Sequence, residues 1–202
     1  MNIATVLLAA GGSTRMGSPK QLLLYRGQTL VRRSTMTALA SPCKPVHVVV
    51  GAEADPVRSN LEDLPVEIVE NENWAQGVGS SLRVGLETAL AGTPNLDAVL
   101  FMMCDQPHVT PDAIERLVSA YQQSGVPIVA AGYQNIVGVP ALFSRSIFKD
   151  LLAVPPGEDP KCVIAAHAEQ VFSISVPEAA IDIDTPKDYE ELRWMSDQPQ
   201  SV

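Results

Sequence analysis

The chain has 202 residues and a formal net charge of −9, with 46% hydrophobic and 18% charged residues. These proportions exclude disordered and fibrous classes, and the length suits a single domain over residues 1–196 followed by a frayed tail over residues 197–202. The acidic balance argues against a nucleic-acid-binding surface, which depends on Lys and Arg. No apolar run approaches the ~20 residues of a membrane helix, so we expect a cytoplasmic protein without a membrane partner.

The first half of the chain alternates predicted strands and helices. The apolar run Ile3 to Ala9 is typical of a strand buried on both faces. The further predicted strands are His47 to Val50, Val66 to Val69 and Ala98 to Met103, and the predicted helices are Thr29 to Ala40, Asp55 to Leu64 and Ser80 to Leu90. This alternation indicates a mainly parallel sheet between layers of helices.

The second half of the chain predicts a mixed continuation of the sheet. Pro111 to Gln123 has apolar residues at helical spacing, with Thr110 as the expected N-cap. Further strands are expected at Ile128 to Ala131, Val139 to Phe143 and Val171 to Val176, and further helices at Ser144 to Leu152 and at Pro186 to Met195, the last capped by Thr185. The predicted fold is a three-layer α/β/α sandwich with a mainly parallel, mixed sheet.

The loop after the first predicted strand carries residues suited to phosphate binding. Residues 7–20 read LLAAGGSTRMGSPK. Glycines let backbone N–H groups converge on an anion, while Arg15 offers a planar guanidinium and Lys20 a mobile point charge. Ser18 and Pro19 separate Lys20 from the preceding glycine, so the spacing is not that of a P-loop. A tight turn with solvated charges is the alternative interpretation.

Acidic residues follow two predicted elements. Asp105 comes directly after the strand Ala98 to Met103, and open α/β sheets bind ligands at the carboxyl ends of their strands. Mg²⁺ prefers one or two carboxylates together with phosphate oxygens and waters. Asp182 and Asp184 lie two residues apart on a segment expected to be extended, so they face the same side and either is a possible companion. A turn role for Asp105 and an exposed strand edge for the other two are the alternatives.

A third polar segment lies in the middle of the chain. Residues 71–84 read NENWAQGVGSSLRV, with two glycines and two serines at the expected start of a helix. Backbone donors and hydroxyls at such a position can bind a sugar or a base edge. A capped helix without a ligand is the alternative interpretation.

Taken together, these segments resemble the MobA/MocA-like nucleotidyltransferases. LAAGGSTRMGSPK is similar to the signature loop of this family, and CDQP, DIDTPKDY and the N-x-x-W-x-x-G-x-G-x-S segment resemble motifs of its molybdenum cofactor cytidylyltransferase branch. The similarity covers essentially the whole chain in the expected order. It implies a Rossmann-like nucleotidyltransferase fold of the GT-A type.

The resemblance also implies roles for individual residues. Arg15, Lys20 and Asp105 would be catalytic, and Mg²⁺ would bind Asp105 and Asp182, with Asp184 as the alternative ligand. The residues expected to bind the nucleotide are Leu8, Ala9, Ala10, Gly11, Gly12, Ser13, Met16, Gly79, Ser80 and Ser81. Ala10 resembles the cytidine-using branch, because the guanylyl-using branch tends to have LAGG, so CTP is favoured over GTP.

The function that the resemblance implies is transfer of a nucleotidyl group to a phosphorylated acceptor such as molybdopterin, with release of pyrophosphate and delivery of the product to a molybdoenzyme. Residues 157–162, GEDPKC, depart from the branch, since Cys162 stands where an Arg is usual, and Lys161 is a candidate substitute. A sugar-phosphate or other metabolite-phosphate nucleotidyltransferase, and a non-catalytic carrier that delivers a cofactor, are the alternatives. As an exposed loop cation, Lys20 is expected to contribute little to folding.

Overall fold

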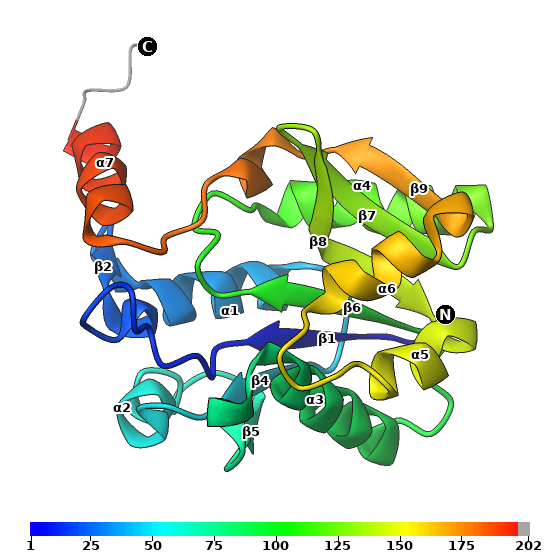
Figure 1. Cartoon of the computed structure of the whole chain (residues 1–202), viewed down its shortest axis with the longest axis horizontal. Helices are drawn as coiled ribbons and strands as arrows, with labels where there is room; N and C mark the ends of the chain where they lie inside the picture. Colours follow the sequence, from blue (N-terminus) through cyan, green and yellow to red (C-terminus); the bar gives the residue numbers. More distant parts are fainter. Residues whose placement is uncertain (198–202) are drawn as a thin grey trace.

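The computed structural model describes residues 1–197 and has a seven-stranded sheet at its centre (Figure 1). The strand order is β5-β4-β1-β6-β8-β7-β9, and β8 runs antiparallel to both β6 and β7 while the remaining pairs are parallel. The predicted mainly parallel, mixed sheet is therefore confirmed. The strands are β1 Ile3–Leu8, β4 Val46–Val50, β5 Glu67–Glu70, β6 Ala98–Met103, β7 Ile128–Tyr133, β8 Ile136–Ser144 and β9 Val171–Ser175.

Helices cover both faces of the sheet, as a three-layer sandwich requires. The apolar side chains of α1, α2 and α4 pack into one hydrophobic cluster with the sheet, and those of α3, α5 and α6 pack into a second cluster on the opposite face. The helices are α1 Leu30–Ala40, α2 Ala54–Ser59, α3 Val78–Gly92, α4 Pro111–Ser124, α5 Phe148–Leu152, α6 Pro160–Ala166 and α7 Pro186–Asp197.

Local chemistry explains where the predicted helices begin and end. The Thr110 side chain accepts a hydrogen bond from Ala113 N at the start of α4, and Gly125 ends this helix in the left-handed conformation that glycine adopts without strain. Helix α3 packs closely on the sheet because Gly85 has no side chain: a methyl group there would lie 2.5 Å from the side chain of Val6. These contacts hold the helices that flank the central strands.

The structure differs from the predicted elements in several places. Helix α2 ends at Ser59, and the predicted helix from Ser144 onward is a short 3-10 turn at Arg145–Ile147 followed by α5. Apart from short 3-10 turns, the elements that were not predicted are the hairpin of β2 Leu24–Tyr25 and β3 Gln28–Thr29, and helix α6. The hairpin strands have only two residues each, and α6 follows a proline- and glycine-rich stretch that is typical of loops.

The C-terminal helix α7 packs beside the β2–β3 hairpin, where Met16, Tyr25 and Leu192 share a small third cluster. Thr185 caps this helix as predicted, since its hydroxyl accepts a hydrogen bond from Asp188 N. The helix extends to Asp197, so the predicted tail overlaps its last residue and otherwise lies outside the described residues. Among residues 1–197, none of the helices combines the length and the apolar character needed to cross a membrane.

Candidate functional site

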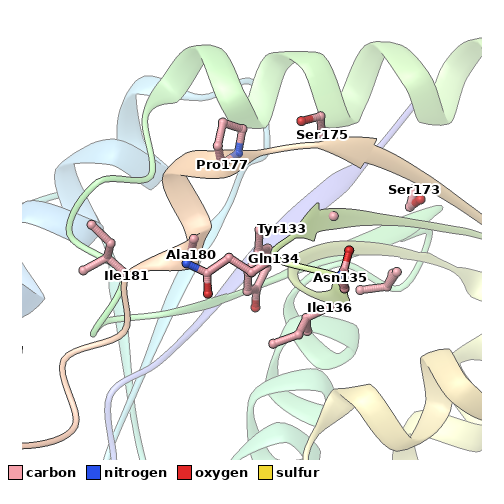
Figure 2. A pocket seen from close by; sticks show the side chains of 11 residues that line it. Tyr133, Gln134, Asn135, Ile136, Ser173, Ser175, Pro177, Ala180 and Ile181 are labelled. Atoms are coloured by element: carbon pink, nitrogen blue, oxygen red, sulfur yellow. The ribbon is translucent and has the colours of Figure 1, made fainter.

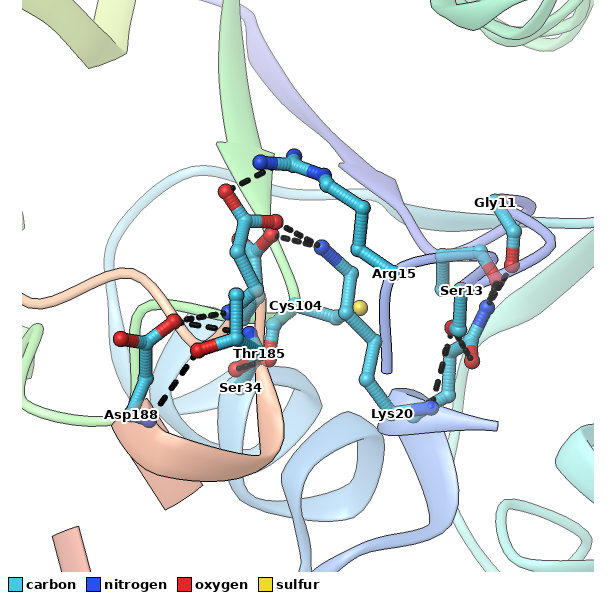
Figure 3. Close-up of polar contacts among 12 residues, drawn as sticks. Gly11, Ser13, Arg15, Lys20, Ser34, Cys104, Thr185 and Asp188 are labelled. Atoms are coloured by element: carbon cyan, nitrogen blue, oxygen red, sulfur yellow. Dashed lines mark hydrogen bonds and ion pairs between the residues drawn. The ribbon is translucent and has the colours of Figure 1, made fainter. Parts of the chain in front are cut away.

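A buried glutamine fixes the glycine-rich loop that follows β1. Gln21 Nε2 donates to the carbonyl oxygens of Ala9, at 3.0 Å, and Gly11, at 2.6 Å. Its Oε1 accepts from the hydroxyl of Ser13, which in turn accepts from the backbone N–H of Lys20 (Figure 3). No role for Gln21 was predicted from the sequence, although an amide side chain between a polar loop and three leucines indicates a hydrogen-bonding role. The loop is therefore held by specific hydrogen bonds, unlike a freely solvated turn.

The loop brings its two cations to the acidic end of β6. Lys20 Nζ lies 2.5 Å from Asp105 Oδ2 and 3.1 Å from Asp184 Oδ1. Arg15 lies 3.0 Å from the other oxygen of Asp184 (Figure 3). Residues far apart in the sequence, at the exit of β1, at the tip of β6 and before α7, thus meet around one point. The roles assigned to Arg15, Lys20 and Asp105 stay predictions, but the structure brings all three together.

One expectation about Lys20 was wrong. Its side chain is only 15% exposed and that of Asp105 only 7%, so the pair is largely buried and is not an exposed loop contact. Burial alone would lower the pKa of Lys20, but the surrounding groups that can carry negative charge, Asp105 foremost and Asp184 among them, together outweigh burial and raise this pKa above its usual value. Removing one partner of a mostly buried ion pair leaves an uncompensated charge, so Lys20 also matters for folding.

A cavity of about 300 Å³ opens beside this ion pair. Asp182 and Asp184 line it together with Asp105, so three carboxylates from two separate segments face the same space. Burial raises the pKa of Asp182, and the nearby negative charge of Asp105 raises it further. The full lining is Arg15, Lys20, Val78, Met103, Asp105, Gln106, Tyr133, Val139, Asp159, Pro160, Lys161, Asp182 and Asp184.

The carboxylates of this cavity fit a hard divalent cation that also binds phosphate. Within the described part of the chain, no three His, Cys, Asp or Glu side chains are arranged to hold a metal ion by themselves. Mg²⁺ does not need such a cage, because one or two carboxylates with substrate phosphates and waters suffice. Asp105 with either Asp182 or Asp184 supplies that number of carboxylates, and the cations Lys20 and Arg15 lie beside them.

The glycine-rich loop lines a second cavity, of about 350 Å³, with Trp74 on its wall. The Trp74 ring lies against Gly12, where a methyl group would come within 2.8 Å of it. Gly11, Gly12 and Ser13 line this cavity. The other predicted nucleotide-binding residues of this region have buried side chains that support the loop from the core: Leu8, Ala9, Ala10 and Met16.

In the middle segment, the predicted nucleotide-binding residues Gly79, Ser80 and Ser81 form hydrogen bonds with other residues of the protein. The backbone N–H of Gly79 donates to Pro156 O at 2.9 Å. Asn71 Nδ2 donates to the buried hydroxyls of both Ser80 and Ser81. A methyl group at Gly79 would lie only 2.2 Å from the Pro155 carbonyl oxygen. Gly79 therefore packs the start of α3 against residues 155–158, while Ser80 and Ser81 hold Asn71, and the role of all three toward a nucleotide stays a prediction.

Comparison with known proteins places this geometry in a family. The profile of the MobA-like NTP transferase domain matches residues 5–171. Nicotine blue oxidoreductase of Paenarthrobacter nicotinovorans is 40% identical over 137 residues, which are 66% of this chain and 63% of that protein. The chain thus spans less than two thirds of the length of the curated relatives it matches, which include bifunctional GlmU proteins.

Solved structures agree with this assignment. Rv0371c of Mycobacterium tuberculosis H37Rv has a TM-score of 0.79 at 29% identity, over 95% of this chain and 97% of that one, and the same protein has been solved in complex with manganese. The nucleotidyl transferase Mth528 of Methanothermobacter thermautotroptrophicus, at 21% identity, shares the fold with a TM-score of 0.81 over 96% of this chain and 97% of its own. Because the profile covers most of the sequence, the chain belongs to the MobA-like NTP transferase domain family, a family of nucleotidyltransferases.

Proposed function

We propose that this protein is a Mg²⁺-dependent enzyme that transfers CMP from CTP to a phosphorylated acceptor such as molybdopterin, with release of pyrophosphate. The observation that carries the proposal is the meeting of Lys20, from the glycine-rich loop, with Asp105, at the tip of β6, beside one cavity. One triphosphate placed there reaches both the cationic loop and the carboxylates that suit a metal ion.

The proposed reaction is an in-line displacement at the α-phosphorus of the triphosphate. An oxygen of the acceptor phosphate forms a new bond to this phosphorus, while its bond to the oxygen bridging to the β-phosphorus breaks and pyrophosphate leaves with the electron pair. The attacking phosphate is already ionised at neutral pH, so the chain needs no general base. Bound Mg²⁺ would neutralise phosphate charge and orient the triphosphate.

The chain's own contribution is to position phosphates and to offset their negative charge. Lys20 and Arg15 are tied to Asp105 and Asp184 in the structure, and an incoming triphosphate offers both cations a stronger anionic partner. The exchange of partners would free the carboxylates for the metal ion. Preorganised donors of this kind stabilise charge that develops during the transfer.

Lys161 is the proposed contact for the acceptor's anionic group. It lines the same cavity, and its side chain passes over Gly138, where a methyl group would lie 3.1 Å from Lys161 Cε. Lys161 is a point charge and lacks the planar fork of the usual Arg, so it selects anions without fixing their orientation. This supports a phosphorylated acceptor, with molybdopterin as the specific choice taken from the family resemblance.

Pyrophosphate release tests the proposal directly. Each of the four ribonucleoside triphosphates is incubated with Mg²⁺ and with molybdopterin, a sugar phosphate or no acceptor, and matched reactions contain a chelator. We expect release with CTP and molybdopterin that the chelator abolishes. Release with a sugar phosphate alone would favour the metabolite-phosphate alternative. Binding of CTP without release for every acceptor would overturn the proposal in favour of a carrier.

The relative from Paenarthrobacter motivates a second candidate function. At 40% identity over 137 residues, its printed name denotes an oxidoreductase that acts on nicotine blue. A loop that binds the phosphates of CTP could also bind those of a dinucleotide electron donor. The check is the visible absorbance of nicotine blue with the protein and a reduced nicotinamide dinucleotide. We expect no change, and a loss of colour that depends on both protein and donor would favour oxidoreduction.

A further inference from the structure

A hollow lies beside the functional cavity, which is the space of about 300 Å³ next to Lys20 and Asp105. The hollow measures about 670 Å³ and lies between the tip of the β7–β8 hairpin and the turn that follows β9 (Figure 2). Among the described residues, none of those that line it carries a charge at neutral pH, whereas three cations and four carboxylates line the functional cavity. The hollow instead offers amides, hydroxyls and apolar side chains, from Gln134, Asn135, Ser173, Ser175, Ile136 and Val137. It therefore suits an uncharged group.

The hollow and the functional cavity share a boundary. Tyr133 lines both spaces. One segment also passes from the first to the second, since Ala180 and Ile181 line the hollow while Asp182 and Asp184 line the cavity. Consecutive residues span at most about 3.6 Å each, so the backbone of Asp184 lies within roughly 11 Å of the backbone of Ile181. A single small molecule can therefore occupy both spaces.

A buried amide fixes the position of this boundary. Gln106 follows Asp105 at the carboxyl end of β6 and is only 3% exposed. Its Nε2 donates to Val139 O at 3.2 Å and to Ala179 O at 3.1 Å. These bonds tie β8 and the turn that follows β9 to the tip of β6. The hollow is therefore held in a fixed relation to the carboxylate proposed to bind the metal ion.

Lys161 reaches the same boundary from α6. Its side chain and the Tyr133 hydroxyl both lie over Gly138, where a methyl group would come within 3.1 Å of Lys161 Cε and 3.0 Å of Tyr133 Oη. Burial, and then the negative charge of Asp182, raise the pKa of Tyr133, so its hydroxyl is neutral at pH 7. The proposed contact for the acceptor's phosphate is thus next to the uncharged hollow.

We infer that the hollow binds the uncharged part of the acceptor, while the acceptor's phosphate lies at Lys161. The inference rests on the proposed function, which supplies a phosphorylated acceptor. The acceptor class is then a phosphate ester whose remaining part is a neutral ring or short chain with hydrogen-bonding groups. Inorganic phosphate, which has no such part, and polyanions, whose further charges find no cation in the hollow, fall outside this class.

The size and the lining of the two spaces support this division. Small-molecule sites usually measure about 300–1,000 Å³, so the functional cavity alone is small for a triphosphate together with a whole acceptor. Gln134 and Asn135 each offer both a donor and an acceptor for hydrogen bonds. Ile136 and Val137 are exposed apolar side chains at the same hairpin tip, and they can pack against the face of a ring. The hollow thus supplies both kinds of contact that a neutral polar ring needs.

Equilibrium dialysis with Mg²⁺ and without nucleotide tests the inference. The probes are molybdopterin, glucose 1-phosphate and inorganic phosphate, of which only the first two join a phosphate to a ring system. We expect at least one of these two to bind about tenfold more tightly than inorganic phosphate, or tighter still. Ser173→Phe places an aromatic ring in the hollow, and aromatic residues suit a strand. It should raise the Kd of that probe by about tenfold or more and leave the Kd of inorganic phosphate unchanged.

Ser119→Phe is the matched control, because Ser119 is also exposed but lines the groove between α4 and β9 instead. It should bind all three probes like the wild type, and circular dichroism should show that the variants are folded. Gln134→Met keeps the length of an exposed side chain and removes its amide, so it provides a second variant if Ser173→Phe does not fold. It should raise the Kd of the same probe by about threefold to tenfold, as the loss of one hydrogen bond predicts.

Two results would overturn the inference. One is a wild-type protein that binds neither ring-bearing probe more tightly than inorganic phosphate, and the other is a set of folded variants that bind these probes like the wild type. The dialysis contains no nucleotide, so its outcome is separate from that of pyrophosphate release. Affinity that depends on the hollow, without any transfer, would contradict the proposed function and keep the binding site. Transfer with no effect of Ser173→Phe or Gln134→Met on acceptor affinity would contradict only the inference.

Discussion

The two walls of the functional cavity differ in how firmly they are held. On one wall, Lys20 and Asp105 are 15% and 7% exposed and lie 2.5 Å apart. On the other, Lys161 and Asp159 are 44% and 42% exposed, with their charged atoms 4.0 Å apart. The first wall is held by this close and largely buried ion pair, and in the proposed function it binds the triphosphate. The second wall, called the open wall below, is also where the sequence departs from the cytidylyltransferase branch. We therefore expect acceptor choice to depend on this wall, with little effect on nucleotide binding.

The sharpest test of this contrast compares two lysines. Lys20→Ala should lower kcat by about 10²- to 10³-fold, because it removes a preorganised donor from the transferring phosphates. Lys161→Ala should mainly raise KM for the acceptor and leave kcat with a saturating acceptor nearly unchanged. Steady-state kinetics of pyrophosphate release would measure both. Equal losses of kcat in the two variants would contradict the proposal that one wall binds the triphosphate and the other binds the acceptor.

The same Lys20 variant should also lose stability. Breaking a fully buried ion pair costs about 3–5 kcal/mol, and partial solvation of this pair reduces the expected loss to roughly 1–3 kcal/mol. Urea unfolding monitored by circular dichroism would measure it. Lys161→Ala is the matched control, because its exposed contact with Asp159 should contribute roughly 0–1 kcal/mol. If Lys20→Ala is as stable as the wild type, the ion pair between Lys20 and Asp105 contributes little to the free energy of unfolding.

Gly79 packs against the segment that leads into Asp159, so it tests how the open wall is positioned. Gly79→Ala forces a methyl group against the Pro155 carbonyl oxygen, and we expect a stability loss of about 1–3 kcal/mol from this overpacking. Gly11→Ala is the control, since a methyl group at Gly11 meets nothing within 4 Å and should leave the unfolding free energy nearly unchanged. Thermal unfolding would separate them. An unaffected Gly79→Ala protein would mean that residues 155–158 move aside easily.

Asp182 and Asp184 are the two candidates for the second metal ligand beside Asp105. Asp182 and Asp184 both line the cavity, but Asp184 already bonds Lys20 and Arg15, whereas burial and the proximity of Asp105 raise the pKa of Asp182. A cation relieves that unfavourable environment, so Asp182→Asn should raise the Mg²⁺ concentration for half-maximal activity by about tenfold. Asp184→Asn should change it less. The reverse order, in a Mg²⁺ titration of pyrophosphate release, would make Asp184 the ligand.

The sequence predicts the approach of Lys20 and Asp105 better than it predicts the structure around Lys161, for physical reasons. Lys20 and Asp105 follow buried parallel strands, and the carboxyl ends of such strands meet at one edge, so their approach follows from the topology alone. Gln21 was missed because its role depends on carbonyl groups that only the folded loop presents. Helix α6 was missed although Asp159 and Pro160 carry the same signal as the start of α4, because the helix has only seven residues and follows a stretch rich in proline and glycine.

The smallest expected effect concerns His47, a residue of β4 whose protonation should affect the free energy of unfolding at low pH. His47 is fully buried, and burial lowers its pKa below the usual value despite the carboxylate of Glu67. Below about pH 6.5 the unfolded state therefore binds more protons at this histidine than the folded state does. The free energy of unfolding is highest above about pH 6.5 and falls as the pH drops toward the lowered pKa. His47→Leu should flatten the dependence of Tm on pH below about 6.5. If the slope of Tm against pH is the same in both proteins, another group causes it, and differences in activity at low pH then need a separate stability control.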